Sequence, residues 1–146
     1  MNITFQENGN LPRGIYLMTI EEFEKEFGYT PHRKKLIDGL KTGMKDLQEC
    51  GCSMIFIDGS FVTKKNTPGD FDACWNTEGV DLNKLKEKHE ILLDFTYERK
   101  RQKEKYCGEF FPAHFAAQLD PYTTYYHFFQ KDKENNPKGI VQINLK

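Results

Sequence analysis

The spacing of apolar residues predicts a long amphipathic helix in the first third of the chain. Between residues 36 and 47, apolar side chains recur at intervals of four, four and three residues. They are Leu36, Leu40, Met44 and Leu47. This spacing puts them on one face of a helix, which we expect to pack on a sheet. Thr30-Pro31 supplies a capping residue and a tolerated proline at its start, and Gly51 ends it.

A shorter helix is predicted just before it. Thr19 is followed three residues later by Glu22, the pattern of a capping box, and Gly28 stops the helix after Phe27. Residues 1–18 contain turn-forming residues between short apolar pieces, so we expect them to form an N-terminal arm.

Short apolar or alternating stretches predict four strands. They are Ser53–Ile57, Asp70–Trp75, Tyr106–Phe111 and Gly139–Leu145. The charged stretch from Val80 to Lys105 is expected to be mostly helical, with a break near residues 90–94 where Asp94 caps a second helix. The aromatic segment 122–129 has no clear period. The sequence therefore predicts one α+β domain over residues 1–146, a mixed sheet with helices on one side.

Composition narrows the function classes. The chain has 146 residues, with 38% hydrophobic and 29% charged residues and a formal net charge of −1. This balance argues against a DNA-coating protein, which would carry a strong basic excess. No apolar stretch approaches the roughly 20 residues that span a bilayer, and the first residues do not resemble a signal peptide. We expect a cytoplasmic protein with no membrane partner.

The chemistry concentrates between Met54 and Trp75. An apolar run ends in Asp58-Gly59-Ser60, and after nine more residues comes Asp70-Phe71-Asp72. Gly59 would let backbone N–H groups approach a phosphate, and the Ser60 hydroxyl would add a donor. Asp70 and Asp72 are two residues apart in a predicted strand, so they share a face and repel each other unless a cation lies between them. Oxygen ligands of this kind suit Mg²⁺ or Mn²⁺.

A plainer interpretation exists for each half of this pattern. The aspartates could be surface residues of an edge strand, with Asp70 closing the Pro68-Gly69 turn, and Gly59-Ser60 could be an ordinary turn. The metal site is favoured because aspartate is depleted in strands and two here interrupt an apolar run.

Gly-Ser, a gap of nine residues and Asp-apolar-Asp together resemble the signature of the polymerase-beta-like nucleotidyltransferase superfamily. With Thr63, Lys65 and Pro68, and with the closing segment 137–140, the chain is similar to a small bacterial family of nucleotidyltransferase-like proteins. The resemblance implies a nucleotidyltransferase-like fold with the Asp pair at the open edge of the sheet. It also implies that Gly59, Ser60, Thr63 and Lys65 bind the nucleotide, although a loop lysine is commonly just solvated.

The resemblance further implies transfer of a nucleoside monophosphate from a nucleoside triphosphate to a hydroxyl of a protein or RNA, with Mg²⁺ or Mn²⁺ on Asp70, Asp72 and a third acid. Small relatives of this kind include members of toxin–antitoxin pairs, which favours a partner-protein or defence-linked role. The alternative is a nucleotide-binding or protein-interaction module that has lost catalysis. A structural partner whose acidic pair is incidental is a third interpretation.

Glu109 is the preferred third acid, because it lies in the middle of an apolar strand where a lone carboxylate is costly without a cation. Asp120 is the second choice, and Glu109 could instead face solvent on an edge strand. Residues 99–105 carry five positive charges. They could receive an RNA or phosphate acceptor, but a solvated helix face balanced by Glu98 and Glu104 is the favoured interpretation.

Overall fold

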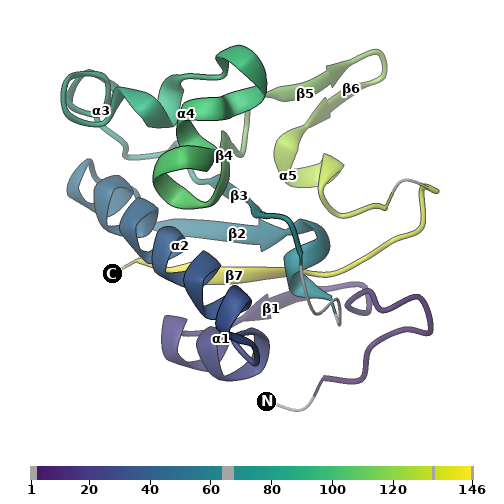
Figure 1. Cartoon of the computed structure of the whole chain (residues 1–146). Helices are drawn as coiled ribbons and strands as arrows, with labels where there is room; N and C mark the ends of the chain where they lie inside the picture. Colours follow the sequence, from purple (N-terminus) through teal and green to yellow (C-terminus); the bar gives the residue numbers. More distant parts are fainter. Residues whose placement is uncertain (1–2, 64–67, 133, 146) are drawn as a thin grey trace.

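The fold is a single α+β domain (Figure 1). A computed structural model describes residues 3–63, 68–132 and 134–145, with only the backbone at residues 59 and 60. Within these ranges the chain forms five α-helices, a mixed five-stranded sheet and a separate two-stranded hairpin. The predicted fold class is therefore confirmed.

The five-stranded sheet has the order β1-β7-β2-β3-β4. Its strands are β1 (Ile15–Leu17), β7 (Ile140–Asn144), β2 (Met54–Asp58), β3 (Phe71–Trp75) and β4 (Gly108–Pro112). β2 runs antiparallel to both β3 and β7, whereas β1 pairs parallel with β7 and β4 parallel with β3. All four predicted strands are present, each with bounds shifted by one or two residues.

The first two helices form as the sequence predicts. At the start of α1 (Ile20–Phe27), the Glu22 N–H donates to the Thr19 hydroxyl at 3.1 Å, and the Thr19 N–H donates to the Glu22 carboxylate at 3.0 Å. Thr30 caps α2 (Pro31–Glu49) in the same manner, and Pro31 occupies its first position. The predicted apolar face of α2 is buried except for the half-buried Met44.

The two faces of the sheet have different covers. α2 crosses one face (Figure 1), which contributes the side chains of Ile57, Ala73 and Phe110 to the main core. The opposite face carries a smaller cluster around Phe56, Cys74 and Phe111, covered by aromatic residues of α5 (Tyr125–Phe128). The far end of this second face is where the acidic residues lie.

The charged stretch after β3 is interrupted where the sequence predicts. α3 (Leu82–Lys88) is followed by a 3₁₀ turn (Glu90–Leu93) and by α4 (Thr96–Tyr106). The Asp94 carboxylate accepts from the Thr96 N–H at 3.0 Å, but the N-cap position of α4 is Phe95, so the prediction that Asp94 caps the helix is wrong. The first turn of α4 is unusual, because Tyr97, Glu98 and Arg99 have φ of 51°, 57° and 62°. Each left-handed residue costs about 1–2 kcal/mol, so other contacts must hold this turn.

Three further expectations need correction. The segment 1–18, predicted to be an arm, contributes the edge strand β1 to the sheet. The Asp pair does not lie at an open edge: β3 is an interior strand, because β4 pairs parallel on its outer side. The hairpin of β5 (Ala116–Leu119) and β6 (Tyr122–Thr124) was not predicted, because its first strand lacks apolar alternation.

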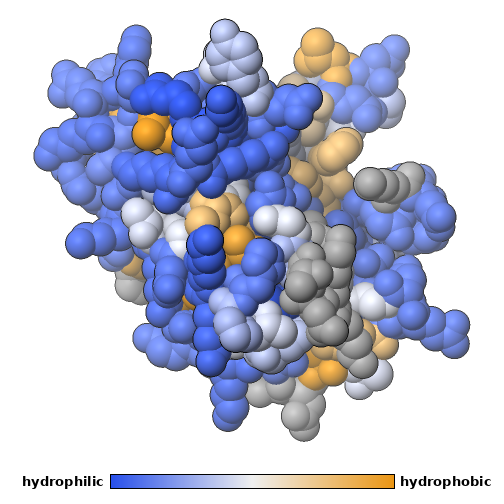
Figure 2. Space-filling view, in the orientation of Figure 1, coloured by the Kyte–Doolittle hydropathy of each residue, from blue (hydrophilic) through white to orange (hydrophobic). Residues whose placement is uncertain are grey.

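The surface on the α2 side is mainly hydrophilic, as Figure 2 shows, with apolar side chains visible over the region of the hairpin. Phe115 and Leu119 are exposed there. No helix in the described ranges combines the length and the apolar character that crossing a bilayer requires.

The contact between α2 and the end of α4 can be tested at Gly39. A Cβ at this position would overlap the backbone oxygen of Tyr106. We expect Gly39→Ala to lower the free energy of unfolding by about 1–3 kcal/mol, even though alanine is favoured over glycine in a helix interior by about 1 kcal/mol. Urea unfolding measures the change.

Gly69→Ala is the matched control, because a Cβ at Gly69 has no neighbour within 4 Å and φ there is not positive. The control should change the free energy of unfolding by less than about 0.5 kcal/mol. Equal stability of the two variants would contradict this close approach of α2 and α4.

Candidate functional site

A row of three carboxylates crosses adjacent strands of the sheet. Asp58, the last residue of β2, pairs across the ladder with Asp72 of β3, and Asp72 pairs with Glu109 of β4. Residues directly opposite each other in a sheet point to the same face. The three acids therefore lie side by side on the face away from α2. We call Asp58, Asp72 and Glu109 the acid row.

The pKa of Asp72 shows that this arrangement concentrates negative charge. Burial is the largest cause that raises it, to about 8, followed by a hydrogen bond with Glu109 and by the charges of Glu109 and Asp70. The pKa of Asp70 is raised too, by burial and by the charge of Glu109. Asp70 thus adds a fourth carboxyl group next to the row.

Glu109 shifts in the opposite direction. Burial by itself would raise its pKa, but the hydrogen bond with Asp72 and the cations Lys103 and Arg99 lower it overall. The Lys103 ammonium lies 3.1 Å from the Glu109 carboxylate, and the Arg99 guanidinium lies 3.2 Å from it. Near neutral pH one proton is therefore held on Asp72, and Asp72 donates it to the ionised Glu109.

Asp58 has a different cation. The Lys138 ammonium lies 3.9 Å from Asp58 Oδ2, and both side chains are largely buried, at 13% and 3% exposed. Lys138 precedes β7, so its side chain reaches Asp58 from the strand on the other side of β2. The acid row is thus neutralised from two sides, by α4 at Glu109 and by Lys138 at Asp58.

The Gly-Ser turn follows Asp58 directly. It is a 3₁₀ turn (Gly59–Val62). The fully buried guanidinium of Arg33 donates to the carbonyl of Phe61 at 2.6 Å and to that of Thr63 at 2.9 Å. Arg33 on α2 therefore fixes the exit of the turn, a role with no signal in the sequence.

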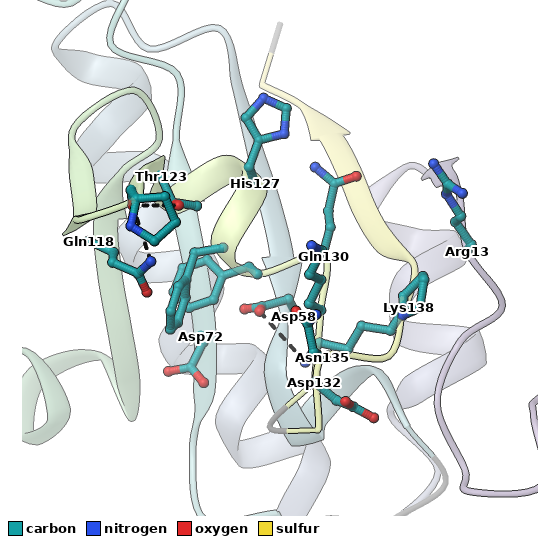
Figure 3. Close-up of a pocket in the computed structure, with 15 residues that line it drawn as sticks. Arg13, Asp58, Asp72, Gln118, Thr123, His127, Gln130, Asp132, Asn135 and Lys138 are labelled. Carbon is teal, nitrogen blue, oxygen red and sulfur yellow. Dashed lines mark hydrogen bonds and ion pairs between the residues drawn. The ribbon is translucent and has the colours of Figure 1, made fainter.

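A cavity opens above the acid row. It measures about 1180 Å³, large enough for a nucleotide, and Asp58 and Asp72 are among its lining residues. Figure 3 shows the two aspartates between Gln118 and Thr123 of the hairpin on one side and Lys138 and Arg13 on the other. Asp70 and Glu109 are influenced instead by Lys103 and Arg99 of α4. The row therefore has a cavity side and an α4 side.

The donor set fits a divalent cation in part. The described ranges contain no group of three acidic, histidine or cysteine side chains placed to hold a metal ion. However, Mg²⁺ in nucleotide sites is usually held by one or two carboxylates together with phosphate oxygens and water. Asp70 and Asp72 fit that pattern, because burial and the neighbouring carboxyl groups raise their pKa values and a bound cation would favour the ionised forms. Glu109 fits less well, because two cations already contact it.

The remaining predicted residues are spread more widely. The backbone carbonyl of Thr63 accepts from Arg33, and its backbone pairs with Asn10. Lys65 lies outside the described residues, as does the side chain of Ser60, and only the backbone is described at Gly59. Asp120 is exposed in the turn of the hairpin, outside the main sheet.

Two alternative interpretations of the acids are wrong. Glu109 does lie on an edge strand, but it is only 8% exposed and so does not face solvent. Asp72 is not on an edge strand. Asp58 is a site residue to which the sequence assigned no role, and its only signal was an acid immediately before Gly-Ser at the end of a strand.

The basic run 99–105 is a balanced helix face only in part. Lys100 pairs with Glu104 at 4.0 Å, and Arg101 pairs with Asp94 at 3.0 Å. Arg99 and Lys103 instead contact Glu109. Two members of the run thus belong to the site, which the expected pairing with Glu98 and Glu104 did not include.

Comparison with known proteins gives the family. Residues 3–144 match DUF6932, described as a family of unknown function. The chain belongs to this family. Comparisons with curated proteins and with solved structures gave no match. The match includes every residue of the acid row and of the cavity lining. Because the family has no described function, an activity for this chain has to be argued from its own geometry.

The acid row predicts how stability depends on pH. Because the folded state raises the pKa of Asp72 from about 4 to about 8, this group stabilises the fold fully below pH 4 and loses that contribution as pH rises through 8. Asp72→Asn removes the titration. We expect the free energy of unfolding of the variant, relative to the natural protein, to increase between pH 5 and 8 by at most about 1.4 kcal/mol per pH unit.

Chemical denaturation at each pH measures this difference, without divalent cations present. Asp38→Asn, at an exposed position of α2, is the control and should track the natural protein across the range. Parallel curves for all three proteins would show that Asp72 is ionised in the folded protein throughout.

Proposed function

We propose that this protein is a metal-dependent nucleotidyltransferase, which moves a nucleoside monophosphate group from a nucleoside triphosphate to a hydroxyl of a protein or RNA. The observation that carries the proposal is the acid row in register across β2, β3 and β4, directly before a Gly-Ser turn and under a cavity of nucleotide size. The resemblance to the polymerase-beta-like nucleotidyltransferase superfamily, with its Gly-Ser and Asp-apolar-Asp pattern, supports the same conclusion.

In this proposal Asp70 and Asp72 hold the Mg²⁺ or Mn²⁺ ion. A bound ion would supply positive charge to the triphosphate oxygens and stabilise the charge that develops on the leaving pyrophosphate. The raised pKa of Asp72 means that it must lose a proton before it can act as a ligand. Glu109 can accept hydrogen bonds from α4 and orient Asp72, and it becomes a ligand only if Lys103 or Arg99 moves away.

Gly59, Ser60 and Thr63 are proposed to bind the triphosphate, together with Lys65. The buried Arg33 supports this role for the turn, because its guanidinium donates to the carbonyls of Phe61 and Thr63 at the end of the turn. The start of the turn, next to Asp58, is not used by these two bonds. No residue near the row is placed as a covalent nucleophile among the described residues. We therefore propose direct transfer, with the acceptor hydroxyl attacking the α-phosphorus in line.

The acceptor class rests on resemblance. Small relatives in toxin–antitoxin pairs modify a partner protein, and others modify RNA, so a defence-linked protein or RNA acceptor is the proposal for this chain. The hairpin contributes Gln118 and Thr123 to the cavity, and Leu119 on it and Phe115 just before it are exposed and available to a macromolecule.

One observation favours a second function. Glu109 is already neutralised by Lys103 and Arg99, so the third acid of an active nucleotidyltransferase is engaged inside the protein. A catalytically inactive nucleotide-binding or protein-interaction module would keep the cavity and the Gly-Ser turn while lacking this third ligand.

A transfer assay separates the two functions. The protein is incubated with each α-labelled nucleoside triphosphate, Mg²⁺ or Mn²⁺, and cell extract, and labelled protein or RNA is detected after electrophoresis. We expect labelling that Asp70→Asn and Asp72→Asn each reduce by at least about 100-fold, the effect typical of losing a group that stabilises transition-state charge. Asp38→Asn should label normally.

Nucleotide binding in the absence of labelling would support the inactive module. Labelling that survives both substitutions at Asp70 and Asp72 would contradict the enzymatic proposal, because it would have to arise elsewhere.

A further inference from the structure

We infer that Lys138 and Arg13, two cations that line the cavity, make an anion-binding subsite for phosphate groups of the substrate. The inference deepens the proposed function and rests on it for the identity of the ligand. Lys138 lies at the Asp58 end of the acid row, and Arg13 lies apart from it with its guanidinium directed away from the Lys138 ammonium, so the two contact different phosphate groups (Figure 3).

Lys138 lines the cavity, and its ammonium has few hydrogen-bond acceptors around it. Its side chain is 13% exposed, and the nearest acidic partner in the described ranges is Asp58 at 3.9 Å. A well-formed ammonium–carboxylate hydrogen bond is closer to about 2.8 Å, and an ammonium has three N–H groups to donate. The pair therefore compensates charge but leaves Lys138 able to donate to a further acceptor from the cavity.

The backbone around Lys138 is fixed and so holds this position. The Lys138 N–H donates to the Gln130 carbonyl at 2.9 Å, and the Gly139 N–H donates to the Leu11 carbonyl at 3.1 Å. A Cβ at Gly139 would collide with the Pro12 carbonyl. Glycine at this position therefore allows the segment before β1 to lie directly against the start of β7.

Arg13 reaches the subsite because of that close approach. The loop that carries it is bound on both sides to β7, through the bond to Leu11 and through the Ile140 N–H, which donates to the Gly14 carbonyl at 3.0 Å. Arg13 lines the same cavity as Lys138, and no ion pair involves it within the part of the chain that the structure describes. Its guanidinium is thus free to approach a ligand.

The other charges of the cavity favour a phosphate. Lys131 also lines it, so three cations line the cavity. The Asp132 carboxylate already accepts from the backbone N–H groups of Glu134 at 2.9 Å and Asn136 at 2.8 Å and from the Asn10 side chain at 3.3 Å. Arginine and lysine together are typical of phosphate recognition, the first as a planar fork and the second as a point charge.

A metal–phosphate complex matches both sides of the cavity. In such a complex the cation would face the carboxyl groups of the acid row. The phosphate oxygens would face Lys138 and Arg13. The phosphate has two sources, the triphosphate of the nucleotide or a phosphate of the acceptor, and the experiment distinguishes them. If instead Lys138 serves only to neutralise Asp58, its replacement leaves ligand binding unchanged.

Calorimetry tests the subsite with three probes: inorganic triphosphate, ATP, and a short 5′-phosphorylated RNA. Each is titrated, with and without Mg²⁺, into the natural protein, Lys138→Met, Arg13→Gln and the control Lys86→Met at an exposed position of α3. We expect Lys138→Met and Arg13→Gln each to raise the Kd for triphosphate and ATP by about tenfold or more, as for losing one hydrogen bond to a charged group. Lys86→Met should bind like the natural protein.

A tenfold weakening confined to the phosphorylated RNA would support the subsite and assign it to the acceptor. Unchanged binding of all three probes by both variants, or no binding by the natural protein, would overturn it. Arg13 is exposed, so its variant gives an answer even if Lys138→Met fails to fold, and Lys138→Arg should restore binding. Because these measurements need no transfer, the subsite and the enzymatic proposal can fail separately.

Discussion

The site depends on one constraint, the register between β2, β3 and β4. That register puts Asp58, Asp72 and Glu109 at neighbouring positions on one face of the sheet, where burial and mutual repulsion make three ionised carboxylates unfavourable. The fold answers this in two ways. Cations approach the two ends of the row, Lys138 at Asp58 and α4 at Glu109, and Asp72 in the middle keeps a proton at neutral pH. If one of these strands shifted its register by one residue, its carboxyl group would point to the opposite face, into the core under α2.

Asp72, in the middle of the row, is therefore the carboxyl group that a bound cation would stabilise most. Burial first, and then its carboxyl neighbours, raise the pKa of Asp72, so a divalent cation that replaces its proton would supply the charge that the ionised group lacks there. The ends of the row are already paired, and their cations come from segments that other contacts fix. For this reason the proposed metal site uses Asp70 and Asp72 with phosphate oxygens rather than a cage of three protein ligands.

Local patterns predicted much of the scaffold. The capping box at Thr19, the amphipathic period of α2 and the break at Asp94 depend on residues three or four apart, so the sequence carries them directly. The hairpin after β4 was not predicted, because its first strand lacks apolar alternation. The left-handed turn at Tyr97–Arg99 has no sequence signal either, since no glycine marks it.

For the site, the sequence by itself determined two features, the Gly-Ser turn after an apolar strand and the Asp-apolar-Asp pair. Each is a short continuous stretch that belongs to one strand and its adjoining turn. Only the tertiary structure decided which acids meet. Strand pairing brought Asp58 and Glu109 to Asp72, and the contact of Gly139 with the segment before β1 brought Arg13 to the cavity that Lys138 lines. Such neighbours are set by hydrogen-bond register and close packing between segments up to about the full chain length apart, which no local pattern of residues encodes.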